Sequence, residues 1–185
     1  MFVVVMTALI VMACGGQRQS SERATRIMEV AYKSKDYSRL LQVADSLDAE
    51  GELAQAEAYY WRGYASDRMK KKRMAEFYFK TAIDAASESS DKASVDVYAK
   101  AASRLASLLS VRGDYEGTLK MAEPVAKRIE DLKADTTSDY VNLLIYIGCC
   151  QSATKDKKDA TDGSVPAQAR ARGSVWDRSL FGPRP

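Results

Sequence analysis

The strongest nucleophiles in this chain are its three cysteines, Cys14, Cys149 and Cys150, and the sequence has no histidine to activate them. Without histidine there is no Ser-His-Asp or Cys-His pair, no histidine zinc site and no phospho-accepting histidine. The carboxylates are scattered, and no two are placed for acid–base chemistry. We therefore expect a protein that is not an enzyme, with no catalytic residues, no metal site and no cofactor.

Cys14 follows an apolar run, residues 2–13, with the sequence FVVVMTALIVMA. This run is too short for a membrane span, which needs about 20 residues, and it fits the apolar core of a secretory leader. Val11-Met12-Ala13-Cys14 resembles a bacterial lipobox, and the resemblance implies that the Cys14 thiol is lipidated and becomes the mature N-terminus. No Lys or Arg precedes the run, so either the true start lies upstream or the leader is uncleaved or spurious. The alternative is a buried apolar strand or helix.

The other two cysteines are neighbours in the sequence. Adjacent Cα atoms lie about 3.8 Å apart, below the usual range for a disulfide, and the spacing fits no metal site. We expect Cys149 and Cys150 to be two small buried hydrophobic residues on a helix.

The composition favours one helical domain. The chain has 185 residues, of which 46% are hydrophobic and 29% charged, and its 10 glycines and 4 prolines are few for a loop-rich or all-β protein. The net charge of +3 is too small to make nucleic acid the main partner. Between residues 21 and 160, apolar residues recur at intervals of three and four, as in amphipathic helices.

Breaks in this pattern predict about seven helices joined by short turns. Helices are expected to end in left-handed residues at Gly51 and Gly113. The next helices are expected to begin at polar capping residues, which are Asp36, Asp91, Asp114 and Ser138. The breaks fall at residues 33–35, 50–51, 70–73, 87–91, 112–113 and 134–137.

The helical region repeats itself. Tyr59, Gly63, Ala75, Phe79 and Ala82 resemble the tetratricopeptide (TPR) consensus, in which an aromatic residue, a glycine, an alanine, a phenylalanine and an alanine recur. The alanine-type position returns at Leu40, Ala75, Thr118 and Ala160, at intervals of 35, 43 and 42 residues, against about 34 in the consensus. Departures from the consensus are Ser66, Lys72, Thr118 and Pro124, the last of which is expected to kink a helix or start a new one.

The resemblance implies an all-α fold, an antiparallel helix-turn-helix, right-handed solenoid of about three and a half repeats over residues 21–160. In such a fold Gly63 allows two helices to approach closely, with Ala75 as its small counterpart. Phe79 and Ala82 then fill the gap toward the next repeat. The fourth repeat would begin around Gly148 and place Ala160 on its second helix.

The remaining segments are assigned by composition. Residues 1–14 are interpreted as the signal and lipobox, and residues 15–20 as a tether. Residues 161–185 contain three of the four prolines and no periodic apolar face, and we interpret them as a disordered or aberrant tail. A basic, aromatic binding peptide is the alternative for this tail.

Residues 75–81 and 140–151 are similar to periplasmic TPR proteins of Bacteroidota and to the sensor regions of histidine kinases. This similarity implies a lipid-anchored protein-interaction module on the periplasmic side of the envelope. The alternative is a truncated sensor region of a two-component kinase.

In TPR proteins a peptide or protein partner binds in the concave groove, and the residues that match the groove positions here are Tyr60, Tyr64, Arg68, Lys100, Ser103, Ser107 and Asn142. Two tyrosines one turn apart beside an arginine would offer apolar area and a charge-assisted hydrogen bond. The alternative is that Tyr60 and Tyr64 only pack between helices. Trp61 is expected on the face opposite Tyr64, in the core. The basic run at residues 68–73 could contact anionic lipid or an acidic partner, or could be a solvated turn.

Overall fold

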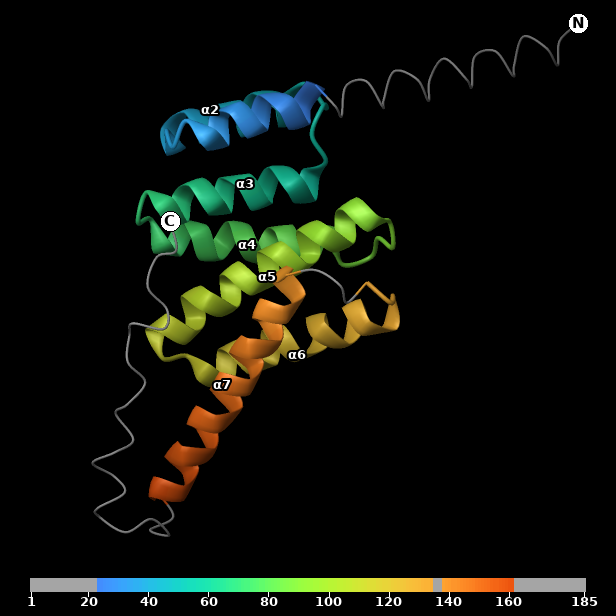
Figure 1. The fold of residues 1–185 in the computed structure, drawn as a ribbon. Coiled ribbons are helices and arrows are strands. Elements are labelled where there is room, and N and C mark those ends of the chain that lie inside the picture. Colours follow the sequence, from blue (N-terminus) through green and yellow to red (C-terminus); the bar gives the residue numbers. More distant parts are fainter. Residues whose placement is uncertain (1–22, 135–137, 162–185) are drawn as a thin grey trace, which may run out of the picture.

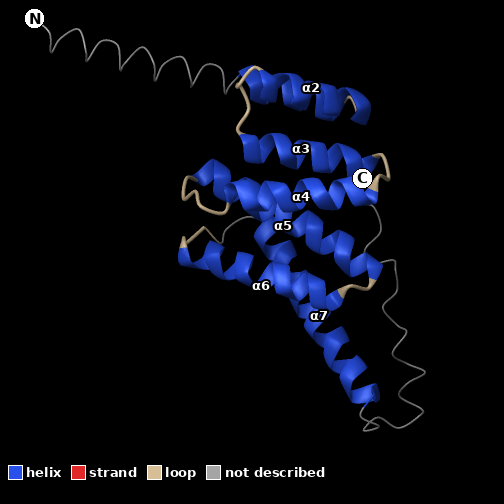
Figure 2. Cartoon of the chain, turned by 180° about the vertical axis from the view of Figure 1, so that it is seen from behind, coloured by secondary structure: helices blue, strands red, loops and turns tan. Residues whose placement is uncertain are grey.

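The computed structural model describes residues 23–134 and 138–161, and this part of the chain is helical and contains no strand (Figures 1 and 2). The all-helical class predicted from the sequence is therefore confirmed. Residues 23–33 are helical. They are followed by α2 (Tyr37–Ala49), α3 (Gln55–Arg68), α4 (Lys72–Ala86), α5 (Lys92–Arg112), α6 (Tyr115–Asp131) and α7 (Ser138–Thr161). Cys14, the tether at 15–20 and residues 162–185 lie outside the described residues.

Local sequence explains where the helices begin and end. The carboxylates of Asp36, Asp91 and Asp114 each accept a hydrogen bond of 3.0 Å from the backbone N–H three residues on, as predicted for helix caps. Gly51 and Gly113 adopt the left-handed conformation, with φ of 70° and 82°. Ser138 is the first residue of α7.

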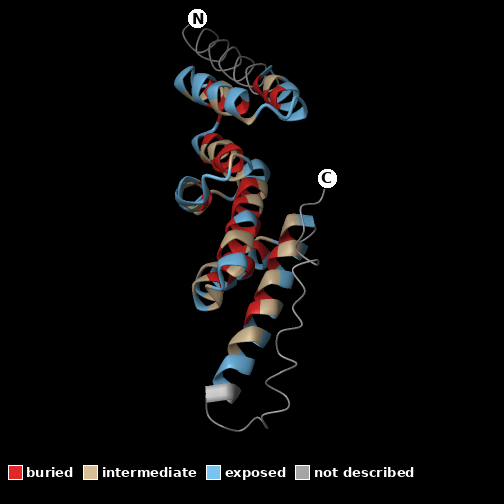
Figure 3. Ribbon diagram, turned by 90° about the vertical axis from the view of Figure 1, so that its left-hand side faces the viewer, coloured by how far each residue is buried: buried red, intermediate tan, exposed pale blue. Residues whose placement is uncertain are grey.

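Each helix packs against the next, and from α2 to α6 consecutive helices run in opposite directions (Figure 1). Two further contacts skip one helix: α3 touches α5, and α5 touches α7. The buried residues form one hydrophobic core that extends from Ala24 to Ile147. Exposed residues predominate toward the C-terminal end of α7 (Figure 3). The three helices α3, α5 and α7 therefore form a connected row.

The α3–α4 interface depends on Gly63. A Cβ atom at this position would lie 2.7 Å from two ring carbons of Phe79, closer than side chains tolerate. Phe79, Ala75 and Ala82 are fully buried, and Tyr59 stacks on Tyr78 with a ring separation of 6.4 Å. The predicted close approach at Gly63 is confirmed, but the group that fills the space is the ring of Phe79 rather than the methyl of Ala75.

Three residues that the sequence alignment matched occupy equivalent positions in the even-numbered helices. Leu40, Ala75 and Thr118 are each the fourth residue of their helix, in α2, α4 and α6, and each is fully buried. The hydroxyl of Thr118 donates a 2.7 Å hydrogen bond to the carbonyl of Asp114. Threonine is therefore tolerated at this alanine-type position because its polar atom has a partner.

One prediction about a helix end was wrong. α7 is one continuous helix to Thr161, so Ala160 lies in its last turn and not on a second helix of a fourth repeat. Residues 152–160 contain neither Gly nor Pro, and nothing in them stops the helix. Of the two alternatives for Pro124, the start of a new helix is excluded, because α6 continues through it.

The two adjacent cysteines are free. Cys150 is buried, with its Sγ 3.3 Å from the hydroxyl of Ser110, and Cys149 is half-buried. The prediction of two buried residues is confirmed for Cys150 only.

Candidate functional site

Five aromatic rings gather around α3, and we call them the aromatic cluster. The cluster contains Tyr32 from the first helix, Tyr37 from α2, and Tyr60, Trp61 and Tyr64 from α3. Tyr64 contacts each of the other four rings. Its ring centroid lies 5.5 Å from that of Tyr32, 6.3 Å from Tyr37, 6.4 Å from Tyr60 and 6.0 Å from Trp61. Tilted and edge-on rings at these separations attract one another beyond simple burial. The cluster therefore joins the first three helices.

Trp61 belongs to this cluster and does not lie on the opposite face from Tyr64 as predicted. Residues three apart on an α-helix share a face, and the two rings make an edge-on contact at an interplanar angle of 78°. The indole N–H of Trp61 donates to the Glu57 carboxylate at 3.3 Å, and its side chain is half-buried.

Tyr60 and Tyr64, the central residues of the predicted groove, are largely buried. Only 8% and 7% of their surfaces are exposed. Tyr32, in contrast, is 42% exposed although its ring contacts both Trp61 and Tyr64. Tyr60 and Tyr64 therefore form the buried base of the site, and the exposed part of the Tyr32 ring is the aromatic surface that a partner can contact.

Two arginines lie against the cluster and keep their charged groups at the surface. The guanidinium of Arg68 lies 5.3 Å from the centroid of Tyr37 and donates to its hydroxyl at 3.1 Å. The guanidinium of Arg104, on α5, lies 5.2 Å from the centroid of Tyr64. Both arginines are exposed. A guanidinium that lies over a ring can donate its remaining N–H groups to a carboxylate.

The phenols of Tyr60 and Tyr64 stay protonated at neutral pH, because the pKa of each is raised. Burial raises the pKa of Tyr60, and Arg104 opposes part of that shift. Burial, and next a hydrogen bond with Tyr32, raise the pKa of Tyr64 well above its ordinary value. Neutral phenols donate hydrogen bonds and are poor nucleophiles, so the site is suited to binding.

The remaining predicted groove residues lie on the next two helices of the row. Lys100, Ser103 and Ser107 have a helical spacing of three and four on α5, which places them on one side of that helix together with Arg104. Lys100 and Ser107 are half-buried and Ser103 is buried. Asn142 is half-buried on α7. Asp139, in the first turn of α7, is close enough to act on the pKa of Tyr60, so α7 reaches the cluster as well.

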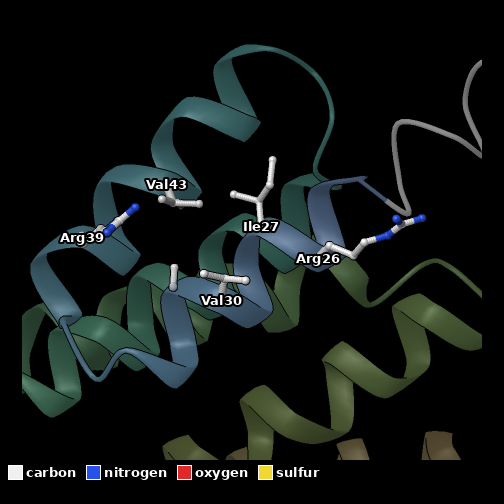
Figure 4. A pocket seen from close by; sticks show the side chains of 6 residues that line it. Arg26, Ile27, Val30, Arg39 and Val43 are labelled. Atoms are coloured by element: carbon white, nitrogen blue, oxygen red, sulfur yellow. The ribbon is translucent and has the colours of Figure 1, made fainter.

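A shallow hollow lies beside the first helix (Figure 4). Ile27 and Val30 from the first helix and Val43 from α2 form its apolar wall, while Arg26 and Arg39 stand around it. This hollow was not predictable from the sequence. Its wall comes from two helices, and the periodicity of one helix does not show how it lies relative to the other.

The site has no feature of a metal centre in the described part of the chain, where no three Cys, Asp or Glu side chains gather as ligands would. No helix within residues 23–134 and 138–161 is long and apolar enough to cross a membrane. No family model matches the sequence, and no curated protein matches it.

Sequence reasoning missed Tyr32, Tyr37 and Arg104 as members of the site. Arg104 lies between Ser103 and Ser107, which the repeat alignment selected, and it follows Ser103 directly. Tyr32 is 32 residues before Tyr64, close to the repeat length of about 34. Comparing positions about one repeat length apart on the first helix and on α3 would therefore have pointed to Tyr32.

Proposed function

We propose that this chain is a non-catalytic scaffold that binds a protein or peptide partner on the row of α3, α5 and α7, together with the adjoining first helix. The fold proposed for it is a TPR-like right-handed solenoid. The observation that carries the proposal is the row itself, in which α3 touches α5 and α5 touches α7. On it, the exposed guanidinium groups of Arg68 and Arg104 lie over the rings of Tyr37 and Tyr64. Tyr64 also contacts the accessible ring of Tyr32. This chemistry suits an extended peptide that presents a carboxylate next to an apolar side chain.

The binding surface is tested by site-specific photo-crosslinking in the full chain. A benzophenone side chain at Ser107, on α5, is expected to capture the partner, and the same group at Glu116, exposed on α6, serves as the matched control. Arg104→Glu is expected to reduce the Ser107 crosslink about tenfold or more, because it replaces attraction for a carboxylate by repulsion. Equal crosslinking at both positions, or no effect of Arg104→Glu, would contradict the proposal. Tyr60 and Tyr64 are poor test positions because their substitution opens the core.

We also propose that a lipid on Cys14 holds this scaffold at the periplasmic face of a bacterial envelope. The support is Val11-Met12-Ala13-Cys14 after an apolar run. Metabolic labelling with palmitate is expected for the natural chain and should be lost in Cys14→Ala. Labelling that persists in Cys14→Ala would reject the anchor and leave the binding surface untouched.

The second candidate is the sensor region of a two-component kinase, and one observation favours it. The apolar side chains of Val141, Leu144 and Ile145 are exposed on α7, and nothing lies within 4 Å of a Cβ built on Gly148. At the corresponding Gly63, Phe79 of the following helix fills that space. A further helix packed on α7, as in a longer repeat region, would cover this face. DNA downstream that encodes more helical repeats, an apolar segment of about 20 residues and a kinase would support this candidate over the lipoprotein.

A further inference from the structure

Exposed apolar side chains and cations occur together where the beginning of α4 meets the end of α5. Phe77 is 62% exposed and Val111 is 73% exposed, and Met74, one turn before Phe77, is also exposed. Single exposed apolar residues are ordinary on protein surfaces. A phenylalanine and a methionine adjacent on one helix face need an explanation.

Cations lie beside Phe77. Arg73, Lys80 and Arg112 line one shallow hollow together with Phe77 and a single carboxylate, Glu76. The sequence places Lys70 and Lys71 in the turn immediately before α4. The hollow therefore has three positive charges and one negative charge.

Glu76 holds two of the cations in place. Its Oε1 accepts from Lys80 at 2.8 Å, and its Oε2 accepts from Arg112 at 2.7 Å. Arg112 also contacts Asp114 at 3.1 Å. The hydrogen bond from Lys80 is the largest cause that lowers the pKa of Glu76 below its ordinary value. Burial opposes this shift, and the hydrogen bond from Arg112 adds to it. Arg73 has no ion pair within the described residues, so the patch keeps an excess of positive charge.

We propose that this patch, formed by Arg73, Met74, Phe77, Lys80 and Arg112, binds an anionic membrane surface. An apolar side chain inserts at the boundary between headgroups and acyl chains, and each cation near an anionic surface strengthens the binding. The hollow is open and shallow, with no walls that would select the shape of a protein partner. Lipid headgroups need no such walls, since they rearrange around the apolar side chains.

The patch comes from α4 and the last turn of α5, and it shares no residue with the aromatic cluster. The inference does not depend on the proposed anchor at Cys14, although a lipid at that position would bring the patch close to a membrane.

The test uses the full, unlipidated chain and tryptophan as a local reporter. Phe77→Trp places the reporter in the patch, and Ile145→Trp places it at an apolar position on α7 that is 51% exposed and serves as the matched control. Emission is measured as the difference from the parent chain, with vesicles of phosphatidylglycerol and phosphatidylcholine or of phosphatidylcholine alone. We expect a shift to shorter wavelength for Trp at position 77 with anionic vesicles only, and none for Trp at position 145.

Charge supplies the second arm of the test. Arg73→Glu, combined with Phe77→Trp, is expected to raise the anionic lipid concentration needed for half of the shift about tenfold, and added salt is expected to have the same direction of effect. Positions 73 and 77 are both exposed. Circular dichroism should therefore show an unchanged fold in Phe77→Trp and in the double variant with Arg73→Glu.

Three outcomes would overturn the inference. They are no shift at position 77, an equal shift with phosphatidylcholine alone, and a shift at position 77 with polyglutamate but not with vesicles. The crosslink from Ser107 reports the proposed partner surface separately, so failure of one proposal does not imply failure of the other.

Discussion

At the scale of single residues, two glycines of the same helical pattern have opposite surroundings. Gly63 lies against the ring of Phe79, whereas a Cβ on Gly148 would meet nothing within 4 Å. Both lie inside helices, where glycine costs about 0.5–1 kcal/mol relative to alanine. The difference between the two substitutions therefore isolates the packing contribution at Gly63.

We predict that Gly63→Ala destabilises the protein by about 1–3 kcal/mol, because the ring of Phe79 or the backbone has to move to admit the methyl group. Gly148→Ala is the matched control and is expected to stabilise the protein by about 0.5–1 kcal/mol. Urea unfolding followed by circular dichroism measures both. A stabilised Gly63→Ala variant would show that α3 and α4 are not as close as described.

Asp91, the cap of α5, is expected to give a local pH dependence. Hydrogen bonds from the Ser89 hydroxyl, and next from Ser94, lower the pKa of Asp91 to about 2. An Asp in an unfolded chain titrates near 3.9. The stabilisation is therefore fully present above about pH 4 and is lost as the pH falls toward about 2.

Titration of the carboxyl carbon by NMR checks this prediction, with an expected midpoint of about 2 for Asp91. Protonation of Asp91 contributes to the loss of stability between pH 5 and pH 2. Asp91→Asn should therefore lose less stability over this pH range than the natural chain. A midpoint near 4 would mean that the cap does not form in solution.

At the scale of elements, the sequence predicts the helix boundaries well where the signal is local. A carboxylate at Asp36, Asp91 or Asp114 needs only its own next turn to form a cap, and a glycine such as Gly113 needs only its own φ. The register of α4 was also predictable, since Gly63 and Phe79 are both part of the repeat pattern.

Other features of the elements depend on tertiary contacts and were not predictable in the same way. Burial of Tyr64 follows from the rings of Tyr32 and Tyr37, which come from two other helices. Placing Trp61 opposite Tyr64 was an error of helix geometry, since a separation of three residues keeps the side chains on one face. The uninterrupted length of α7 contradicts the repeat alignment at Ala160, because the local helix-forming sequence prevailed over the expected turn.

The two faces of α7 are expected to respond differently to substitution. Leu143 is fully buried, while Ile145 is exposed. We predict that Leu143→Ala costs about 2–5 kcal/mol of unfolding free energy and that Ile145→Ser changes it by less than about 0.5 kcal/mol. Chemical denaturation of both variants measures the contrast. A large loss in Ile145→Ser would show that another helix already covers this face of α7 in solution.

At the scale of the whole molecule, contacts join each helix to its neighbours in the chain or to the next but one. α5 touches α3, α4, α6 and α7, whereas α2 touches α3. Stability in such an arrangement is close to a sum of local terms, as in repeat proteins. It should therefore be highest where a helix is covered on several sides.

We predict a gradient of amide hydrogen exchange that is slowest in α5 and faster toward both ends of the described chain. α7 packs against α5 and α6, and its residues Leu143 and Ile147 are buried, while residues 155–158 are exposed. Amides at 155–158 should therefore exchange by local opening, well before those of Leu105 or Leu109 in α5. Mass spectrometry of exchange at neutral pH resolves these segments. Equal protection of residues 155–158 and of α5 would contradict the gradient. It would mean either that the helices unfold as a single unit or that a partner covers the end of α7. Dilution of the protein separates these two causes, because only protection by a partner depends on concentration.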